Sequence, residues 1–143
     1  MEKIQIKFGV SNTDPESPLQ LQVHMDNELL GSLLITQPID VVYDLELEDD
    51  EHELCLILVG KTAAHTVIDE QGTIIKDAML QFSSIEMDDI NIDSVLQKLA
   101  VYTHDFNGSG KPTQSSFFHA QGCNGTVSLK FTSPIYLWLL ENM

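Results

Sequence analysis

The sequence has 143 residues, enough for one domain that buries roughly two-thirds of its unfolded surface without disulfides. Seven Lys and Arg stand against 22 Asp and Glu, and the resulting formal net charge of -15 repels phosphate backbones and anionic lipid headgroups. The basic residues are also scattered, so we expect no nucleic-acid partner. The acidity indicates either solubility alone or docking onto a cation or a basic partner.

The first residues are typical of a strand. Polar and apolar residues alternate from Met1 to Phe8, without the apolar core of a signal peptide. The longest apolar run, Leu54 to Val59, is far shorter than the roughly 20 residues that cross a bilayer. Cys55 and Cys123 allow at most a single disulfide and no four-cysteine metal site, and they favour synthesis in a reducing compartment. We therefore expect no membrane partner.

Short apolar stretches with period-two alternation recur along the chain and predict β-strands. These strands are expected at residues 4–10, 19–25, 29–35, 41–47, 53–59, 73–76, 78–86, 117–121 and 126–131. Their spacing, with Gly, Asn, Asp and Pro between them, argues for an antiparallel β-sandwich or jelly roll. In residues 89–102 a short helix starting near Asp93 or Ser94 competes with another strand. We therefore expect one all-β domain over residues 1–143, with at most one short helix.

The best cation candidate lies in a polar loop, residues 105–116. The side-chain oxygens of Asp105, Asn107 and Ser109 alternate along the chain, and Gly110 follows at the sixth place, as in calcium loops. The bidentate acid of the twelfth place is missing, because Ser116 stands there. A bare turn rich in Asn and Gly needs no ion. We therefore predict at best a weak calcium site and no other cofactor.

Two acidic turns, residues 49–51 and 88–89, are the alternative cation site, provided that they meet at one end of the sandwich. Acidic residues alternate with leucine in residues 44–48, which favours a strand with a solvated acidic face. The sequence does not place the two turns together.

Motifs of known catalytic chemistry are missing. The histidines are His24, His52, His65, His104 and His119. None stands in an H-x-x-x-H pattern that would place two imidazoles on one helical face. A G-x-S-x-G elbow, a glycine-rich phosphate loop and a C-x-x-C pair are also missing. We therefore expect no enzymatic activity.

The segment from Pro134 to Leu140 concentrates large apolar residues, including the single tryptophan. It either seals the core of the domain or forms an exposed partner-binding site through Tyr136, Trp138 and Leu139. The core interpretation is favoured, because terminal elements commonly cover the edge of a sandwich.

Two groups of segments resemble known proteins. Residues 23–31 (VHMDNELLG), 51–54 (EHEL) and 59–62 (VGKT) resemble the small β-sandwich modules of calcium-dependent xylan-binding domains. Residues 102–108 (YTHDFNG), 122–127 (GCNGTV) and 135–143 (IYLWLLENM) are similar to small uncharacterised proteins of tailed phages that infect cyanobacteria. The first resemblance implies a carbohydrate-binding module, and the second implies a virion component without chemistry of its own.

Three functional hypotheses follow. The first is a non-enzymatic phage structural protein, made in the host cytoplasm, that docks on other virion subunits or on itself. The alternative is a lectin-like carbohydrate-binding module with a glycan partner, for which calcium is a candidate cofactor. Sugars usually stack on exposed aromatic rings, and with one Trp and three Tyr this chain has few candidates, because we expect Tyr43, Tyr102 and Tyr136 to be partly buried. The third is a hydrolase, which would need two positioned carboxylates.

Overall fold

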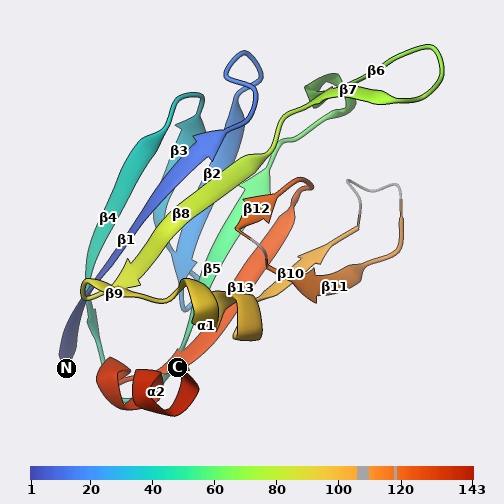
Figure 1. Cartoon of the computed structure of the whole chain (residues 1–143). Helices are drawn as coiled ribbons and strands as arrows, with labels where there is room; N and C mark the ends of the chain where they lie inside the picture. The colour runs from blue at the N-terminus through green and yellow to red at the C-terminus, as the bar shows by residue number, and fades with distance from the viewer. Residues whose placement is uncertain (106–109, 118) are drawn as a thin grey trace.

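A computed structural model describes residues 1–105, 110–117 and 119–143 as an antiparallel β-sandwich (Figure 1). Sheet A has the order β4-β1-β8-β12, with β9 paired to β8. Its strands are β1 (Glu2–Asn12), β4 (Ile39–Leu47), β8 (Leu80–Met87), β9 (Ile90–Asn91) and β12 (Ala120–Gln121). Sheet B has the order β11-β10-β13-β5-β2-β3. Its strands are β2 (Leu19–Met25), β3 (Glu28–Ile35), β5 (Glu51–Val59), β10 (Val101–His104), β11 (Thr113–Ser116) and β13 (Gly125–Thr132).

The predicted β-sandwich is confirmed, and the alternation of apolar residues explains it. Buried residues alternate with more exposed ones along β1, β2, β5 and β13, and only the ends of β1 and β13, at Glu2 and Gly125, depart from this pattern. The buried residues of both sheets belong to one hydrophobic core. The Asp26-Asn27 turn between β2 and β3 has positive φ values of 53° and 67°, which match the twist of a hairpin.

The number of helices exceeds the expected maximum of one short helix. In the described part of the chain, α1 (Asp93–Leu99) and α2 (Ile135–Asn142) are both present, besides the single 3-10 turn η1 (Ala63–His65). Residues 89–102 contain both of the competing elements, because α1 is followed directly by β10. Strand β11 occupies the end of the segment predicted as a loop, where the polar residues 113–116 gave no apolar alternation.

Helix α2 closes one end of the sandwich, near the N-terminus (Figure 1). Its first turn is held by Glu2 of β1, whose Oε1 accepts hydrogen bonds from Ile135 N at 2.8 Å and Ser133 Oγ at 2.6 Å. A carboxylate at this place also interacts favourably with the positive end of the helix dipole. Nowhere in the described chain is a helix long and apolar enough to span a membrane.

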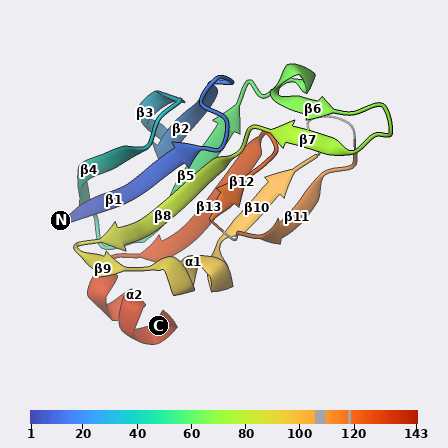
Figure 2. The same ribbon diagram turned by 45° about the horizontal axis from the view of Figure 1, so that its top comes forward.

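A two-stranded hairpin, β6 (Thr66–Ile68) and β7 (Ile74–Asp77), projects from the opposite end of the sandwich (Figure 2). It follows η1 and leads into β8, and its strands pair with each other rather than with sheet A or sheet B.

Candidate functional site

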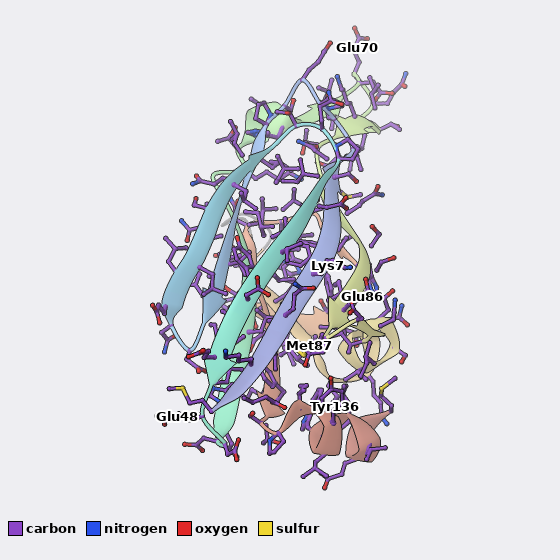
Figure 3. All side chains as sticks on the ribbon, turned by 90° about the vertical axis from the view of Figure 1, so that its left-hand side faces the viewer. Lys7, Glu48, Glu70, Glu86, Met87 and Tyr136 are labelled. Atoms are coloured by element: carbon purple, nitrogen blue, oxygen red, sulfur yellow. The ribbon has the colours of Figure 1, made fainter. Side chains whose placement is uncertain are left out.

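The outer faces of the two sheets differ in charge. Sheet A is charged on its outer face, where Lys3 lies 3.8 Å from Glu46 and Lys7 lies 3.6 Å from Asp89. Lys7 and Glu86 are register partners and lie on this side of the molecule (Figure 3). The predicted acidic face of residues 44–48 belongs to this surface, since Asp44 and Glu46 are exposed and Leu45 is half-buried.

Sheet B carries two rows of uncharged residues across its outer face. The register of its strands aligns Ser32, Gln22, Ile57, Thr126, Thr103 and Gln114 in one row. The next row consists of Leu29, His24, Cys55, Ser128, Val101 and Ser116. Neither row contains an Asp, Glu, Lys or Arg, in a chain whose formal net charge is -15. This surface therefore offers hydroxyl and amide groups between apolar side chains.

A hollow of about 570 Å³ opens onto this face beside α2. Its lining residues are Glu53, Leu99, Val101, Thr103, Gln114, Ser128, Lys130, Trp138 and Asn142. We call this hollow the sheet B groove. Ligand pockets of soluble proteins typically combine an apolar surface with a few polar groups that orient the ligand, and the groove has this composition.

Hydrogen bonds fix some of the polar groups of the groove. Ser128 Oγ donates to Glu53 Oε2 at 2.7 Å, so the hydroxyl holds a carboxylate at the edge of the uncharged rows. Asn142 Nδ2 donates to the Trp138 carbonyl at 2.7 Å, which places the amide of α2 on the groove.

Burial raises the pKa of the Cys55 thiol on the neighbouring strand, and the carboxylate of Glu53 acts in the same direction. The thiol therefore stays neutral at physiological pH.

A second hollow, of about 490 Å³, adjoins the groove and shares Glu53, Lys130 and Trp138 with it. It is lined in addition by Asp26, Glu51, His52, Phe131 and Thr132. The carboxylates make it more acidic than the groove. The two hollows therefore meet at Glu53, Lys130 and Trp138, and the groove adds the uncharged residues of the two rows on sheet B to these shared residues.

The predicted calcium site lies mostly outside the described residues, because the structure describes Asp105 but not Asn107 or Ser109. Gly110 N donates to the Asp105 carbonyl at 2.9 Å. Within residues 1–105, 110–117 and 119–143, no group of three or more His, Cys, Asp or Glu side chains could hold a metal ion. The acidic turns at 49–51 and 88–89 form no such group, and calcium binding stays a prediction.

The residues predicted for partner binding have different environments. Trp138 and Leu139 are buried, with Trp138 packed edge-on against Phe131 at a centroid distance of 6.0 Å. Tyr136 is exposed, and its hydroxyl donates to Asp88 Oδ2 at 3.3 Å. Trp138 and Leu139 therefore belong to the core, as the favoured interpretation of the tail expects, and a partner-binding role stays a prediction for Tyr136.

Sequence reasoning did not identify the groove. Its polar residues Thr103, Gln114 and Ser128 occupy the outward phase of three strands, two of which, β10 and β11, were not among the strands predicted from alternation. The signal available in the sequence was the lack of charge at outward positions, which becomes visible only when the strand register is known.

Cys55 and Cys123 are both free thiols and form no disulfide.

The sequence matches no protein-family model and no curated protein. The fold is similar to that of a solved carbohydrate-binding module described as "vCBM60 in complex with galactobiose". The TM-score is 0.56 and the sequence identity 12%, over 87% of this chain and 96% of that chain. The likeness supports the resemblance to a carbohydrate-binding β-sandwich at the level of the fold. It does not bear on a phage origin, which stays a prediction.

Proposed function

We propose that this chain is a non-catalytic carbohydrate-binding module that binds an uncharged oligosaccharide in the sheet B groove. The observation that carries the proposal is the pair of uncharged rows on sheet B, in a chain that is otherwise strongly acidic. The fold likeness to a carbohydrate-binding module supports it independently.

The groove offers the groups that a sugar needs. A sugar ring has hydroxyl groups around its edge and C–H groups on its faces. Thr103 and Gln114 are paired on neighbouring strands and offer a hydroxyl and an amide to the ring edge. Val101, Leu99 and the edge of Trp138 provide an apolar surface for the C–H groups. Trp138 is only 7% exposed, so we expect edge contact with this ring rather than stacking on its face.

Electrostatics favours an uncharged glycan over a polyuronate. A formal charge of -15 repels a polyanion at long range, and the repulsion weakens when salt shortens the Debye length. The uncharged rows also lack the arginine fork that usually recognises carboxylates. A neutral oligosaccharide avoids both problems.

Calorimetric titration with galactobiose and with longer neutral oligosaccharides tests the proposal. The variant Thr103→Val/Gln114→Ala removes one hydroxyl and one amide group from the groove without introducing charge. Each lost hydrogen bond is worth about 0.5 to 1.5 kcal/mol, so we expect binding to weaken about five- to hundredfold. The matched control is Gln81→Ala, which removes an exposed amide from β8 of sheet A and should leave the affinity unchanged.

Two results would contradict the proposal. One is the lack of any heat with neutral oligosaccharides at millimolar concentration. The other is binding that the groove variant leaves intact, because the ligand would then occupy another surface. Tighter binding of polygalacturonate than of neutral glycans would show that the electrostatic argument is wrong.

A virion role finds no support in the comparisons and stays a prediction, as does localisation in a virion. A carbohydrate-binding module and a virion component are compatible, since a phage particle can carry glycan-binding domains on its surface. The glycan titration addresses the first role only.

A further inference from the structure

The hairpin of residues 66–77, which we call the arm, is the most apolar exposed element of the described chain outside α2. Its exposed aliphatic side chains are Val67, Ile68, Ile74 and Ile75, with exposed fractions of 45, 58, 61 and 66%. Large branched side chains are normally buried in a domain of this size. Ile68 and Ile74 are register partners and lie side by side on one face of the arm, whereas Ile75 faces the opposite side, so the arm exposes aliphatic groups on both faces, and such groups mark interaction sites.

The base of the arm is held rigidly. Lys61 has a side chain only 2% exposed, and its Nζ lies 2.6 Å from Asp77 Oδ1 and also donates to the Gly122 carbonyl. Thr66 Oγ1 donates to the same oxygen of Asp77 at 2.7 Å. Ala78 N donates to the His65 carbonyl at 2.9 Å, which closes the base of the hairpin. The direction of the arm is therefore fixed before any partner arrives, and a fixed arm loses less entropy on binding.

The outer part of the arm has backbone and side chains available for a partner. Within the described residues, neither β6 nor β7 pairs with a third strand. Two-stranded hairpins are only marginally stable in water, and an unpaired strand edge can accept a strand of another chain. Glu70 lies at the tip, at the far end of the molecule from Tyr136 (Figure 3).

The charges around the arm indicate the chemistry of the partner. Asp69 and Glu70 stand at the tip, and Asp69 Oδ1 accepts hydrogen bonds from Gln71 N and Thr73 N. Lys76 is the single lysine of the arm, and its Nζ lies 3.1 Å from Asp14 Oδ1 and 3.7 Å from Glu16 Oε2. The arm and its base are therefore net acidic. A second copy of this chain, with a charge of -15, is repelled, whereas a surface rich in Lys and Arg is attracted.

We propose that the arm inserts its branched aliphatic side chains into an apolar groove of a partner protein, and that lysine and arginine residues border this groove. The aliphatic residues supply the buried contact, and the acidic tip sets the orientation and accelerates association. The arm and the sheet B groove share no residue, so one chain can hold a glycan and a protein partner at once.

A short synthetic peptide of alternating lysine and valine serves as the probe, since it combines an apolar edge with positive charge. Titration is followed by amide chemical shifts of the full chain in NMR. We expect shifts concentrated at residues 66–77, and binding that weakens in about 1 M salt, where the Debye length is about 3 Å. A peptide of alternating glutamate and valine should bind at least tenfold more weakly, a factor that corresponds to about 1.4 kcal/mol.

Matched variants locate the site. Ile68→Thr/Ile74→Thr keeps the β-branched shape that the strands require while removing apolar surface, and should weaken the lysine peptide about tenfold or more. Leu137→Thr/Leu140→Thr removes a similar exposed apolar surface from α2 and should leave the affinity unchanged. Both variants must retain the wild-type spectrum outside the substituted element.

Several results would overturn the proposal. No shift at residues 66–77 with millimolar lysine peptide, or equal binding of the acidic peptide, would refute a basic partner. Self-association through the arm, seen in sedimentation of the wild type and abolished by Ile68→Thr/Ile74→Thr, would identify a second copy as the occupant. Arm-dependent binding to phosphatidylcholine vesicles would identify a lipid surface instead. Loss of glycan binding alone leaves this proposal intact, because the two surfaces are tested by different variants.

Discussion

The imidazole of His52 forms a close ion pair with Asp26, with 2.6 Å between Nδ1 and Oδ2. The other ring nitrogen, Nε2, lies 2.7 Å from the carbonyl oxygen of Glu48. A carbonyl and a carboxylate can only accept, so the ring satisfies both neighbours best as the doubly protonated imidazolium. This ring ties the β2–β3 turn to β5 and to the β4–β5 turn.

This arrangement makes the stability of the fold pH-dependent. Burial alone would lower the pKa of His52, but the hydrogen bonds to Asp26 and to the Glu48 carbonyl outweigh it and raise the pKa above its usual value. Because the pKa of His52 is higher in the folded than in the unfolded state, protonation of the ring stabilises the fold. This contribution is complete below the unfolded pKa of about 6.5. This contribution is lost as pH rises through the folded pKa. The free energy of unfolding, measured with urea from pH 5 to pH 9, should therefore decline above neutrality.

The variant Asp26→Asn should remove most of this contribution. In the wild type, Glu53 N donates to Asp26 Oδ1 at 2.8 Å. The asparagine side chain keeps an oxygen that can accept this hydrogen bond, but it carries no negative charge for the imidazolium. Because a hydrogen bond to a charged group is worth about 1.5 to 3 kcal/mol and Asp26 is partly exposed, we expect a loss of about 1 to 2 kcal/mol at pH 5. Asp49→Asn, in an exposed turn, is the control and should change little. Equal pH profiles of wild type and Asp26→Asn would contradict the assignment.

The sheets themselves could be predicted from the sequence where one face is buried and the other solvated. Residues 19–25 alternate strictly and residues 53–59 form a short, nearly continuous apolar run, and the structure gives β2 over Leu19–Met25 and β5 over Glu51–Val59. Strand β11 could not be predicted, because an edge strand made of Thr, Gln and Ser contributes no buried side chain. Its pairing with β10 depends on backbone hydrogen bonds, which leave no pattern in the sequence.

Tyr102 anchors a turn through its hydroxyl group. The hydroxyl donates to the Cys123 carbonyl and accepts a hydrogen bond from Cys123 N at 2.9 Å, so it links β10 to the turn before β13. Tyr102→Phe leaves both backbone groups without this partner, and the expected loss is about 1 to 3 kcal/mol in the free energy of unfolding. Tyr136→Phe, on the exposed side of α2, is the control and should unfold near the wild-type midpoint.

The same tyrosine provides a spectroscopic check. Burial raises the pKa of Tyr102 to about 12, from about 10 in an unfolded chain. Because the raised value belongs to the folded state, stability is retained below pH 10 and lost as pH rises from about 10 towards 12. In a pH titration followed by phenolate absorbance, one tyrosine should ionise only near pH 12 or when the protein unfolds. This late ionisation should be missing in Tyr102→Phe. Ionisation of every tyrosine near pH 10 in the folded protein would contradict the contact.

The candidate site was less predictable than the fold, for a reason of geometry. The groove combines β5 with α1, β10, β11, β13 and α2, and β5 lies more than 30 residues before the other elements in the sequence. Single-sequence alternation tells which residues face outward but not which strands are neighbours. Ser128 and Val101 are ordinary surface residues until the register pairs them. The tail was ambiguous for a related reason, because an apolar run without alternation fits a buried strand as well as a helix with one buried face.

The role of α2 in the core leads to the last prediction. Its side chains divide between two environments: Trp138 is 7% exposed against Phe131, whereas Leu137 beside it in the sequence is 60% exposed. Trp138→Ala leaves a large cavity between α2 and β13 and should cost about 3 to 5 kcal/mol, a substantial part of the roughly 5 to 15 kcal/mol of a typical domain. Leu137→Ala removes side-chain atoms mostly in water and should change stability by less than about 0.5 kcal/mol.

Urea unfolding monitored by far-UV circular dichroism measures both α2 variants, since the tryptophan signal is lost in one of them. Deletion of residues 134–143 extends the test, because it removes Ile135, Trp138 and Leu139 together and exposes the core residues beneath them. We expect the truncated chain not to fold. If it keeps a β spectrum and a cooperative transition, α2 is an appendage rather than part of the core, and its apolar residues would then serve binding instead of folding.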